Sequence, residues 1–350
     1  MRVAVTGATG NVGTSLVRVL AADPAVTSVL GLARRRPELE LPKTEWVEAD
    51  VERDDLARLF RGVDAVVHLA WRIQPSRDLN SLWRTNVHGS SRTFKAAVEA
   101  GVKAIVHASS VGVYSPGPKD RFVDESWARD GVLTSFYARH KAEVERRLDA
   151  VESAGSVRIV RLRPALIFKR DAASGVRRLF AGPLLPTPLL RRGLVRLVPN
   201  IPGLRFQAVH SDDVADAYRR AVLSDARGAF NVAAGPVLDM PLLARLADAR
   251  LVPVPAFVAR TAVAASWRLR LQPSPAGWFD LGVGVPLMDC ARAREQLGWT
   301  PRRGADAALL ELLEGMRESA GAQTPPLSPR AGGPLRSREL AAGVGARELP

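Results

Sequence analysis

Tyr137 and Lys141 stand four positions apart in the segment FYARHKAE and could together carry out proton transfer. Residues at this spacing in a helix lie on one face, with Cβ atoms about 5–6 Å apart. A free phenol has a pKa of about 10 and is a poor base at neutral pH, but a cation one helical turn away favours the phenolate. The pair also fits an ordinary solvated helix face, so other segments are needed to distinguish the two interpretations.

A glycine-rich segment, TGATGNVG, follows the first apolar run of the chain and predicts a dinucleotide site. Gly7, Gly10 and Gly13 are spaced three apart, which allows a sharp backbone turn and the close approach of a pyrophosphate to the next helix. The dipole and the free N–H groups at a helix N-terminus favour an anion. A purely structural turn is the alternative, but the position between a strand and an amphipathic helix favours cofactor binding.

The end of the second predicted strand carries Arg34, Arg35 and Arg36, with no carboxylate directly after them. A site that selects NAD normally places Asp or Glu here to bind the ribose hydroxyls, whereas a guanidinium pairs well with a 2′-phosphate. We therefore expect NADP as the cofactor, with NAD as the alternative and a solvated basic loop as the non-functional interpretation. Asp50, after the strand-like EWVEA, could contact the adenine amine.

The elements that must position these residues alternate between strands and helices. Short apolar runs such as RVAVTG, DAVVHLA and KAIVHASS are separated by longer amphipathic segments. This alternation predicts right-handed crossovers and a parallel sheet covered on both faces. The expected fold class is α/β, a Rossmann-type doubly wound parallel sheet with a smaller, mostly helical C-terminal substrate-binding region.

The alternation becomes irregular after about residue 168, which divides the chain into parts. Residues 1–168, with about 206–235, are expected to form the NAD(P)-binding domain, and residues 169–205 and 236–316 the substrate-binding region. Residues 317–350 are rich in Pro, Gly, Ser and Arg and contain few large apolar side chains, which predicts a disordered tail.

The composition of the chain limits the partners, cofactors and location that we expect for it. The net charge of +14 could indicate a nucleic-acid partner, but the arginines are scattered through every segment, so we expect a solvated basic surface and no nucleic acid. The single cysteine, Cys290, excludes an internal disulfide, and no His or Cys spacing suggests a metal site. With no apolar stretch of about 20 residues, and an N-terminal apolar run that ends at Gly7, we expect no membrane span, no secretory signal and a cytoplasmic location.

A series of motifs occurs in one order along the chain and carries a resemblance. The motifs are TGATGNVG, Asp50–Val51, HLA at 68–70, TNV around Asn86, HASSVGVY at 107–114, YARHK at 137–141, RLRPALIF, VHSDDVADAY, FNVAAG and LGWTP. Together they resemble the extended short-chain dehydrogenase/reductase superfamily, in particular its NAD-dependent epimerase/dehydratase family, over about residues 1–316. No single motif is specific, but the ordered set is.

The resemblance implies roles for individual residues. Tyr137 would exchange a proton with the substrate, and Lys141 would bind the nicotinamide ribose. Ser110, rather than the adjacent Ser109, would orient the reacting oxygen, and Asn86 would link the lysine to a water relay, unless it is a helix cap. The residues implied to contact the cofactor are Gly7, Thr9, Gly10, Asn11, Val12, Gly13, Arg34, Arg35, Asp50, Val51, Leu69, Ala70, Tyr137, Lys141 and Pro164.

The sequence also departs from the family in ways that narrow its chemistry. Dehydratases carry an acidic pair directly after the active-site Ser or Thr, where this chain has Val111 and Gly112. Nucleotide-sugar epimerases usually have an Asn after the strand RLRPALIF, where this chain has Ala165 or Leu166. They also have an Arg four residues before the histidine of VHSDD, where this chain has Phe206.

Arg205 is one position away from that place, and Trp71 with the apolar segment 179–204 predicts a hydrophobic substrate wall, unless these side chains are plain core. We therefore expect an NADP-preferring oxidoreductase that acts on a small, partly apolar alcohol or carbonyl compound. A (nucleotide-)sugar epimerase and a non-catalytic NADP-binding regulatory protein are the alternatives. A homodimer is common in the family.

Overall fold

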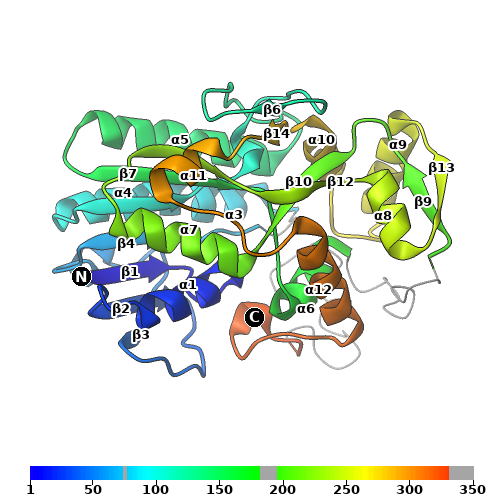
Figure 1. The fold of residues 1–350 in the computed structure, drawn as a ribbon. Helices are drawn as coiled ribbons and strands as arrows, with labels where there is room; N and C mark the ends of the chain where they lie inside the picture. The colour runs from blue at the N-terminus through cyan, green and yellow to red at the C-terminus, as the bar shows by residue number, and fades with distance from the viewer. Residues whose placement is uncertain (74–76, 182–194, 331–350) are drawn as a thin grey trace.

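The computed structural model of the protein, which describes residues 1–73, 77–181 and 195–330, is built on a sheet of seven parallel strands (Figure 1). In sheet order the strands are β11 (Gly228–Val232), β7 (Arg158–Pro164), β5 (Ala104–Ala108), β4 (Ala65–His68), β1 (Arg2–Thr6), β2 (Ser28–Ala33) and β3 (Thr44–Glu48). The chain moves outward from β1 to β3 and then crosses back to β4 on the other side of β1. The strand order therefore reverses between β1 and β4, which confirms the predicted doubly wound Rossmann-type sheet.

Helices cover both faces of this sheet, so its strands are buried on both sides. One core lies between the sheet and α1 (Asn11–Ala22) and α7 (Ser211–Leu223), which pack on each other. The other lies beneath α2 (Leu56–Leu59), α4 (Gly89–Glu99) and α5 (Phe136–Ser153). This burial explains why the strands read as continuous apolar runs rather than alternating ones.

The C-terminal region contains both helices and small sheets. Its helices are α6 (Ala173–Val176), α8 (Met240–Ala247), α9 (Ala256–Arg268), α10 (Ala276–Gly284), α11 (Ala291–Leu297) and α12 (Ala305–Arg317). Its strands are β8 (Leu166–Phe168), β9 (Leu197–Asn200), β10 (Arg205–His210), β12 (Ala234–Asp239), β13 (Arg250–Pro253) and β14 (Leu287–Met288), the last paired with β6 (Phe122–Val123). The prediction of a mostly helical region overlooked β9, β13 and β14, because runs of two to four residues carry no readable period, and it also overlooked the six-residue β12.

The segment after α12 departs from the expected disordered tail. Residues 318–330 fold back along the molecule, and the side chain of Leu327 is buried. The Thr324 hydroxyl donates to the backbone oxygen of Thr9, in the glycine-rich turn, at 2.9 Å. The Ser174 nitrogen also donates to the Ala320 oxygen at 3.2 Å, and the Arg178 guanidinium donates to the Pro326 oxygen at 2.9 Å. A composition-based expectation cannot detect these contacts. Residues 331–350 lie outside the described residues.

Trp299 of the LGWTP segment joins the C-terminal region to the sheet domain. Its ring is fully buried, and its indole nitrogen donates to the backbone oxygen of Asp213 on α7 at 2.8 Å. The preceding Gly298 adopts a φ of 59°, which ends α11 and turns the chain so that the indole points inward.

We expect Trp299→Ala to lower the free energy of unfolding by about 3–5 kcal/mol, because it leaves a cavity and an unpaired carbonyl. Urea denaturation followed by circular dichroism measures the change. Phe257→Ala, at a side chain that is 72% exposed, is the control and should change stability by less than about 0.5 kcal/mol. Equal effects of the two substitutions would contradict the role assigned to Trp299.

Candidate functional site

The glycine-rich turn between β1 and α1 forms a cradle of backbone that side chains would fill. Gly7 has a φ of +70°, and a Cβ there would lie 2.7 Å from the backbone nitrogen of Ala70. A Cβ on Gly13 would lie 2.4 Å from the Gly7 oxygen. Among the described residues no side chain caps the first turn of α1, so its first N–H groups have no side-chain acceptor. These features fit a bound pyrophosphate, which would accept from the free N–H groups.

The ends of β2 and β3 lie beside this turn and carry the residues expected to bind the adenosine. The Ala8 nitrogen donates to the Leu32 oxygen at 3.3 Å, so the turn abuts β2 directly. Arg34 and Arg35 follow β2 on the surface, and Asp50 follows β3 with Oδ1 accepting from the Glu52 nitrogen at 2.9 Å. Val51 is buried against Gly89 of α4, where a Cβ would meet it at 2.8 Å. Parallel strands thus bring the predicted adenosine residues to one edge of the sheet.

The loop after β4 is fixed by polar contacts from both sides. Thr6 accepts from the Leu69 nitrogen through its backbone oxygen (3.1 Å) and from the Ala70 nitrogen through its hydroxyl (3.3 Å). Asn86 is fully buried, accepts from the Arg72 nitrogen at 2.7 Å and donates to the Arg72 oxygen at 3.0 Å. It lies in a π-helical turn, Arg84–His88, and not at a helix N-cap. Its side chain therefore clamps the loop that carries Trp71.

Tyr137 and Ser110 meet at the end of β5. Ser110 caps a short 3₁₀ turn by accepting from the Gly112 nitrogen at 3.0 Å, and Ser135 caps α5 just before Tyr137. Burial raises the pKa of Tyr137 to about 12, and a hydrogen bond with Ser110 opposes that increase. A Cβ on Gly112 would lie 2.9 Å from the Tyr137 ring. Glycine at 112 thus lets the phenol pack against the turn, where an acidic side chain would collide with it.

Lys141 lies one helical turn after Tyr137, as its spacing predicts. Its ammonium is buried, donates to the Ala108 oxygen at 2.6 Å and stands 3.4 Å from the centroid of the Trp71 ring. Burial lowers its pKa to about 7, against the attraction of Glu145. A cation over an indole face is stabilised by the ring quadrupole. Trp71 lies on the loop that Asn86 holds in place, and its ring covers the Lys141 ammonium.

A buried charge network lies behind these residues and was not predicted from the sequence. The carboxylate of Glu145 on α5 binds the guanidinium of Arg163 on β7 at 2.6 Å, and both side chains are inaccessible. Glu145 also accepts from the Ser109 hydroxyl at 2.5 Å, and Arg163 donates to the Tyr114 hydroxyl at 3.0 Å. Ser109 is thereby turned into the core, while Ser110 faces Tyr137.

An aromatic wall, defined here as Trp71, Trp278 and Phe180, lies beside Tyr137. The Trp278 ring of α10 lies 5.0 Å from the Tyr137 ring, and Trp71 meets Tyr137 edge-on at 6.0 Å. Phe180 packs edge-on against Trp278 at 5.0 Å. The indole nitrogens of Trp71 and Trp278 are buried and have no hydrogen-bond partner among the described residues. No local sequence pattern indicated Trp278, because the residue that it contacts, Tyr137, is far away in the sequence.

Gly277 explains how α10 approaches the site so closely. A Cβ at this position would lie 2.4 Å from the Thr134 oxygen, just before α5. The absence of a side chain lets α10 rest on this backbone and places Trp278, the next residue, against Tyr137. Part of the apolar segment 179–204 that was expected to line the site, residues 182–194, lies outside the described residues.

Two further predicted or overlooked residues lie near the cofactor cradle. Pro164 ends β7, where it is buried and pairs with Val232. Lys169, which the sequence did not single out, is buried with its ammonium 2.8 Å from the Asn11 oxygen and 2.7 Å from the Thr14 hydroxyl. Burial lowers its pKa to about 8. The one feature of the sequence that could have drawn attention to Lys169 is that lysine is rare in this chain, with six lysines among 50 basic residues.

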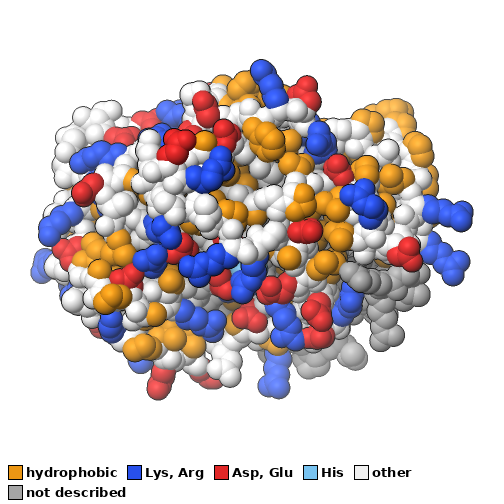
Figure 2. Space-filling view, viewed as in Figure 1, with side chains coloured by type: hydrophobic (Ala, Val, Ile, Leu, Met, Phe, Trp, Pro, Cys, Tyr) orange, Lys and Arg blue, Asp and Glu red, His pale blue; other side chains and the backbone are white. Residues whose placement is uncertain are grey.

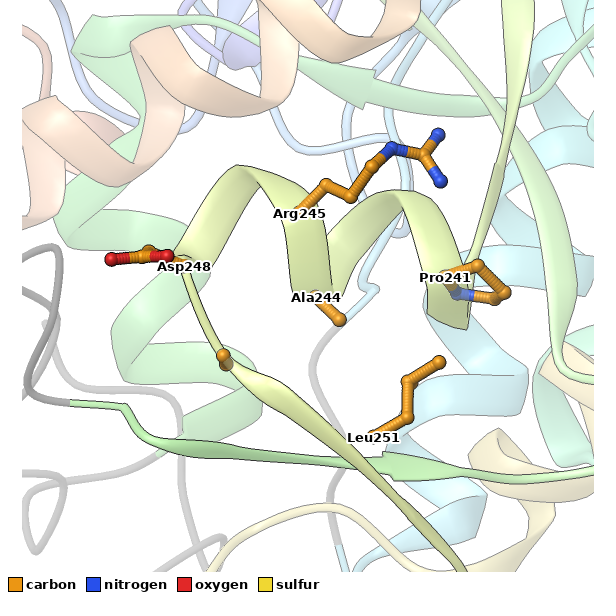
Figure 3. Close-up of a pocket in the computed structure, with 6 residues that line it drawn as sticks. Pro241, Ala244, Arg245, Asp248 and Leu251 are labelled. Carbon is orange, nitrogen blue, oxygen red and sulfur yellow. The ribbon is translucent and has the colours of Figure 1, made fainter.

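Other places in the described residues are less suited to chemistry. A hollow of about 380 Å³ lies between α8 and β13 and is lined by Pro241, Ala244, Arg245, Asp248, Ala249 and Leu251 (Figure 3). Ser110, Tyr137 and Lys141 do not line it. Within the described ranges, no cluster of three or more His, Cys, Asp or Glu side chains could hold a metal ion.

Comparison with known proteins extends this picture. A model of the NAD dependent epimerase/dehydratase family matches residues 3–233. An uncharacterized protein of Mycobacterium tuberculosis is 28% identical over 92% of this chain, and the chain spans only 31% of that relative. An L-arabinose 1-dehydrogenase (NAD(P)(+)) of Haloferax volcanii is 31% identical over 54% of this chain and 85% of its own length.

Solved structures share the fold. The UDP-glucose 4-epimerase of Thermus thermophilus, solved in complex with NAD, superimposes with a TM-score of 0.66 at 21% identity, over 91% of this chain and 99% of its own. A site with a helix N-terminus at a glycine turn and a Ser–Tyr–Lys group at a strand end is thus set in a matching fold. The chain belongs to the NAD-dependent epimerase/dehydratase family.

Proposed function

We propose that the protein is an NADP-preferring oxidoreductase that transfers hydride between the nicotinamide and a small, partly apolar alcohol or carbonyl compound. The observation that carries the substrate class is the aromatic wall, which packs directly around Tyr137. We also propose a cytoplasmic location, because the single cysteine, Cys290, is a free and buried thiol, which suits a reducing compartment.

The positions that would bind a nucleotide diphosphate support the same class. Leu166 and Phe206 stand on neighbouring strands where sugar-nucleotide epimerases usually carry polar residues. The guanidinium of Arg205 donates to the Lys119 oxygen at 2.7 Å. It is therefore engaged with another loop rather than replacing the missing arginine.

The chain's own residues would divide the work at the reacting oxygen. The bound dinucleotide supplies the hydride donor or acceptor. Tyr137 is protonated at neutral pH, because burial raises its pKa to about 12, so it can donate a proton to a carbonyl oxygen during reduction. Ser110 would hydrogen-bond the same oxygen and orient it, and Lys141 would favour the phenolate that remains. The apolar wall excludes water, which strengthens these interactions.

A sugar epimerase is the second candidate, supported by the Thermus thermophilus epimerase that shares the fold. Such an enzyme uses the same Tyr and Lys but returns the hydride to the substrate. Net consumption of NADPH with a panel of carbonyl compounds favours the oxidoreductase, since an epimerase regenerates its cofactor. The intact Ser110, Tyr137 and Lys141 group argues against a non-catalytic regulatory protein.

Tyr137→Phe should lower kcat by about 10²–10⁴-fold and change cofactor affinity far less, because it removes the hydroxyl that exchanges the proton and keeps the ring. Steady-state kinetics and titration of intrinsic tryptophan fluorescence with NADPH measure the two effects. Tyr218→Phe, at a buried tyrosine on α7, is the matched control and should retain turnover. Unchanged kcat in Tyr137→Phe would refute the assignment.

The double substitution Arg34→Ala/Arg35→Ala should weaken NADP binding by about 10–100-fold and leave NAD binding nearly unchanged. Hydrogen bonds to a charged phosphate contribute about 1.5–3 kcal/mol, and only NADP carries the 2′-phosphate. Calorimetric titration of both cofactors gives the affinities, with Arg36→Ala as the neighbouring control. Tighter binding of NAD than NADP by the unchanged protein would contradict the proposed preference.

The stability of the cofactor-free protein should rise with pH above about 7, because Lys141 loses its proton in the folded state first. Its pKa is lowered to about 7 by burial, whereas an unfolded lysine titrates near about 10.4. The unfolded state therefore binds more protons between these values, which makes the slope of stability against pH positive. Urea unfolding from about pH 6 to about pH 9 should show this slope, and Lys141→Met should flatten it. An unchanged slope in the variant would disprove the pKa shift.

A further inference from the structure

We propose that the lobe formed by β9, β13 and α9 docks on the surface of an anionic lipid bilayer. The docking surface is defined as the exposed apolar side chains of this lobe that lie outside the hollow against α8, namely Leu197, Val252, Phe257, Val258, Leu269 and Leu271. These are six of the eleven large apolar side chains that are exposed among the described residues. Figure 2 shows hydrophobic side chains gathered over α9, with Lys and Arg side chains below them.

Helix α9 is the centre of this surface. It is rich in apolar residues, and burial in the protein interior does not explain them. Within its sequence AFVARTAVAASWR no residue is buried. Phe257, Val258, Ala262, Ala265 and Leu269 recur at helical spacing, so they form one outward stripe. Phe257 is 72% exposed and Leu269 is 69% exposed. Contiguous exposed apolar surface of this kind marks an interaction site more often than scattered apolar residues do.

The charged residues near the stripe indicate that its partner is anionic. Between Asp248 and Asp280 the chain has four arginines and no acidic residue. Only one of them, Arg260, is engaged in an ion pair with a described carboxylate, that of Asp280 at 2.7 Å. Arg250, Arg268 and Arg270 are exposed beside the stripe.

Apolar side chains flanked by arginines suit the boundary between anionic headgroups and acyl chains. No described helix is long and apolar enough to cross a membrane, so the contact would be peripheral. A second copy of the chain fits less well, because a two-fold interface would bring these arginines together without opposing carboxylates.

The docking surface is joined to the active site by one helix. The Arg260–Asp280 ion pair ties α9 to α10, and α10 carries Trp278 against Tyr137. The lobe that would meet the bilayer is thus tied to the helix that supplies Trp278 to the aromatic wall. The docking proposal rests on the surface alone, and it stands whether or not the proposed reaction is correct.

Flotation of the full-length protein with vesicles tests the docking surface. We expect binding to vesicles of phosphatidylcholine and phosphatidylglycerol, little binding to phosphatidylcholine alone, and loss of binding at high salt. Phe257→Asp/Leu269→Asp should abolish binding. Phe122→Asp/Leu133→Asp, at exposed apolar residues outside the lobe, should not.

The arginines are tested by Arg268→Gln/Arg270→Gln, which should weaken vesicle binding roughly 30-fold, at about a factor of five for each charge. Arg61→Gln/Arg121→Gln removes the same charge elsewhere on the surface and should leave binding nearly unchanged. Cofactor binding measured by tryptophan fluorescence verifies that each variant is folded.

Three outcomes would overturn the proposal. They are no binding to anionic vesicles, equal loss of binding in the control variants, and a dimer in sedimentation that Phe257→Asp/Leu269→Asp dissociates without any vesicle binding. The last result would assign the stripe to a second copy of the chain. Turnover assays are not needed for any of these outcomes, so failure of the proposed reaction would be recognised separately.

Discussion

The buried ion pair between Glu145 and Arg163 sets the geometry of the whole site. Removing two charges from water is favourable only when close contact and further hydrogen bonds compensate for the lost hydration, and here Ser109 and Tyr114 supply them. Glu145 stands one and two helical turns after Lys141 and Tyr137, on the same stripe of α5. Fixing Glu145 against β7 therefore fixes the rotation of the helix. Tyr137 and Lys141 can then face only the end of β5, where Ser110 stands.

The same burial that fixes the site also sets its protonation. Desolvation favours the neutral forms of both key groups, since it raises the pKa of Tyr137 and lowers that of Lys141. A neutral phenol is the form that protonates a carbonyl oxygen, whereas oxidation of an alcohol requires the phenolate. Under the proposed function this environment suits the reductive direction. The ring of Trp71 opposes the loss of charge from Lys141, because a cation over its face is stabilised.

Local patterns in the sequence predicted the sheet and the residues that gather at the end of β5, and long-range contacts explain what they missed. The glycine spacing, the strand–helix alternation and the Tyr137–Lys141 spacing each depend on a few neighbouring residues, so one sequence is enough to recognise them. Trp278 reaches Tyr137 only because Gly277 lets α10 rest on the Thr134 backbone, which no local pattern encodes. Residues 318–330 pack through Leu327 and Thr324, although their composition resembles that of a disordered tail.

Helix α10 shows how one short element couples the interior of the site to the outer lobe. Gly277 sets its distance from α5, Trp278 closes one side of Tyr137, and Asp280 binds Arg260 of α9. Packed interiors transmit displacement because they contain few voids. A shift of α9 on a surface would therefore move the residue that shapes the space beside the phenol. Under the proposed function, the apolar wall around Tyr137 suits a substrate that partitions out of water, and α10 connects this wall to the apolar outer face of α9.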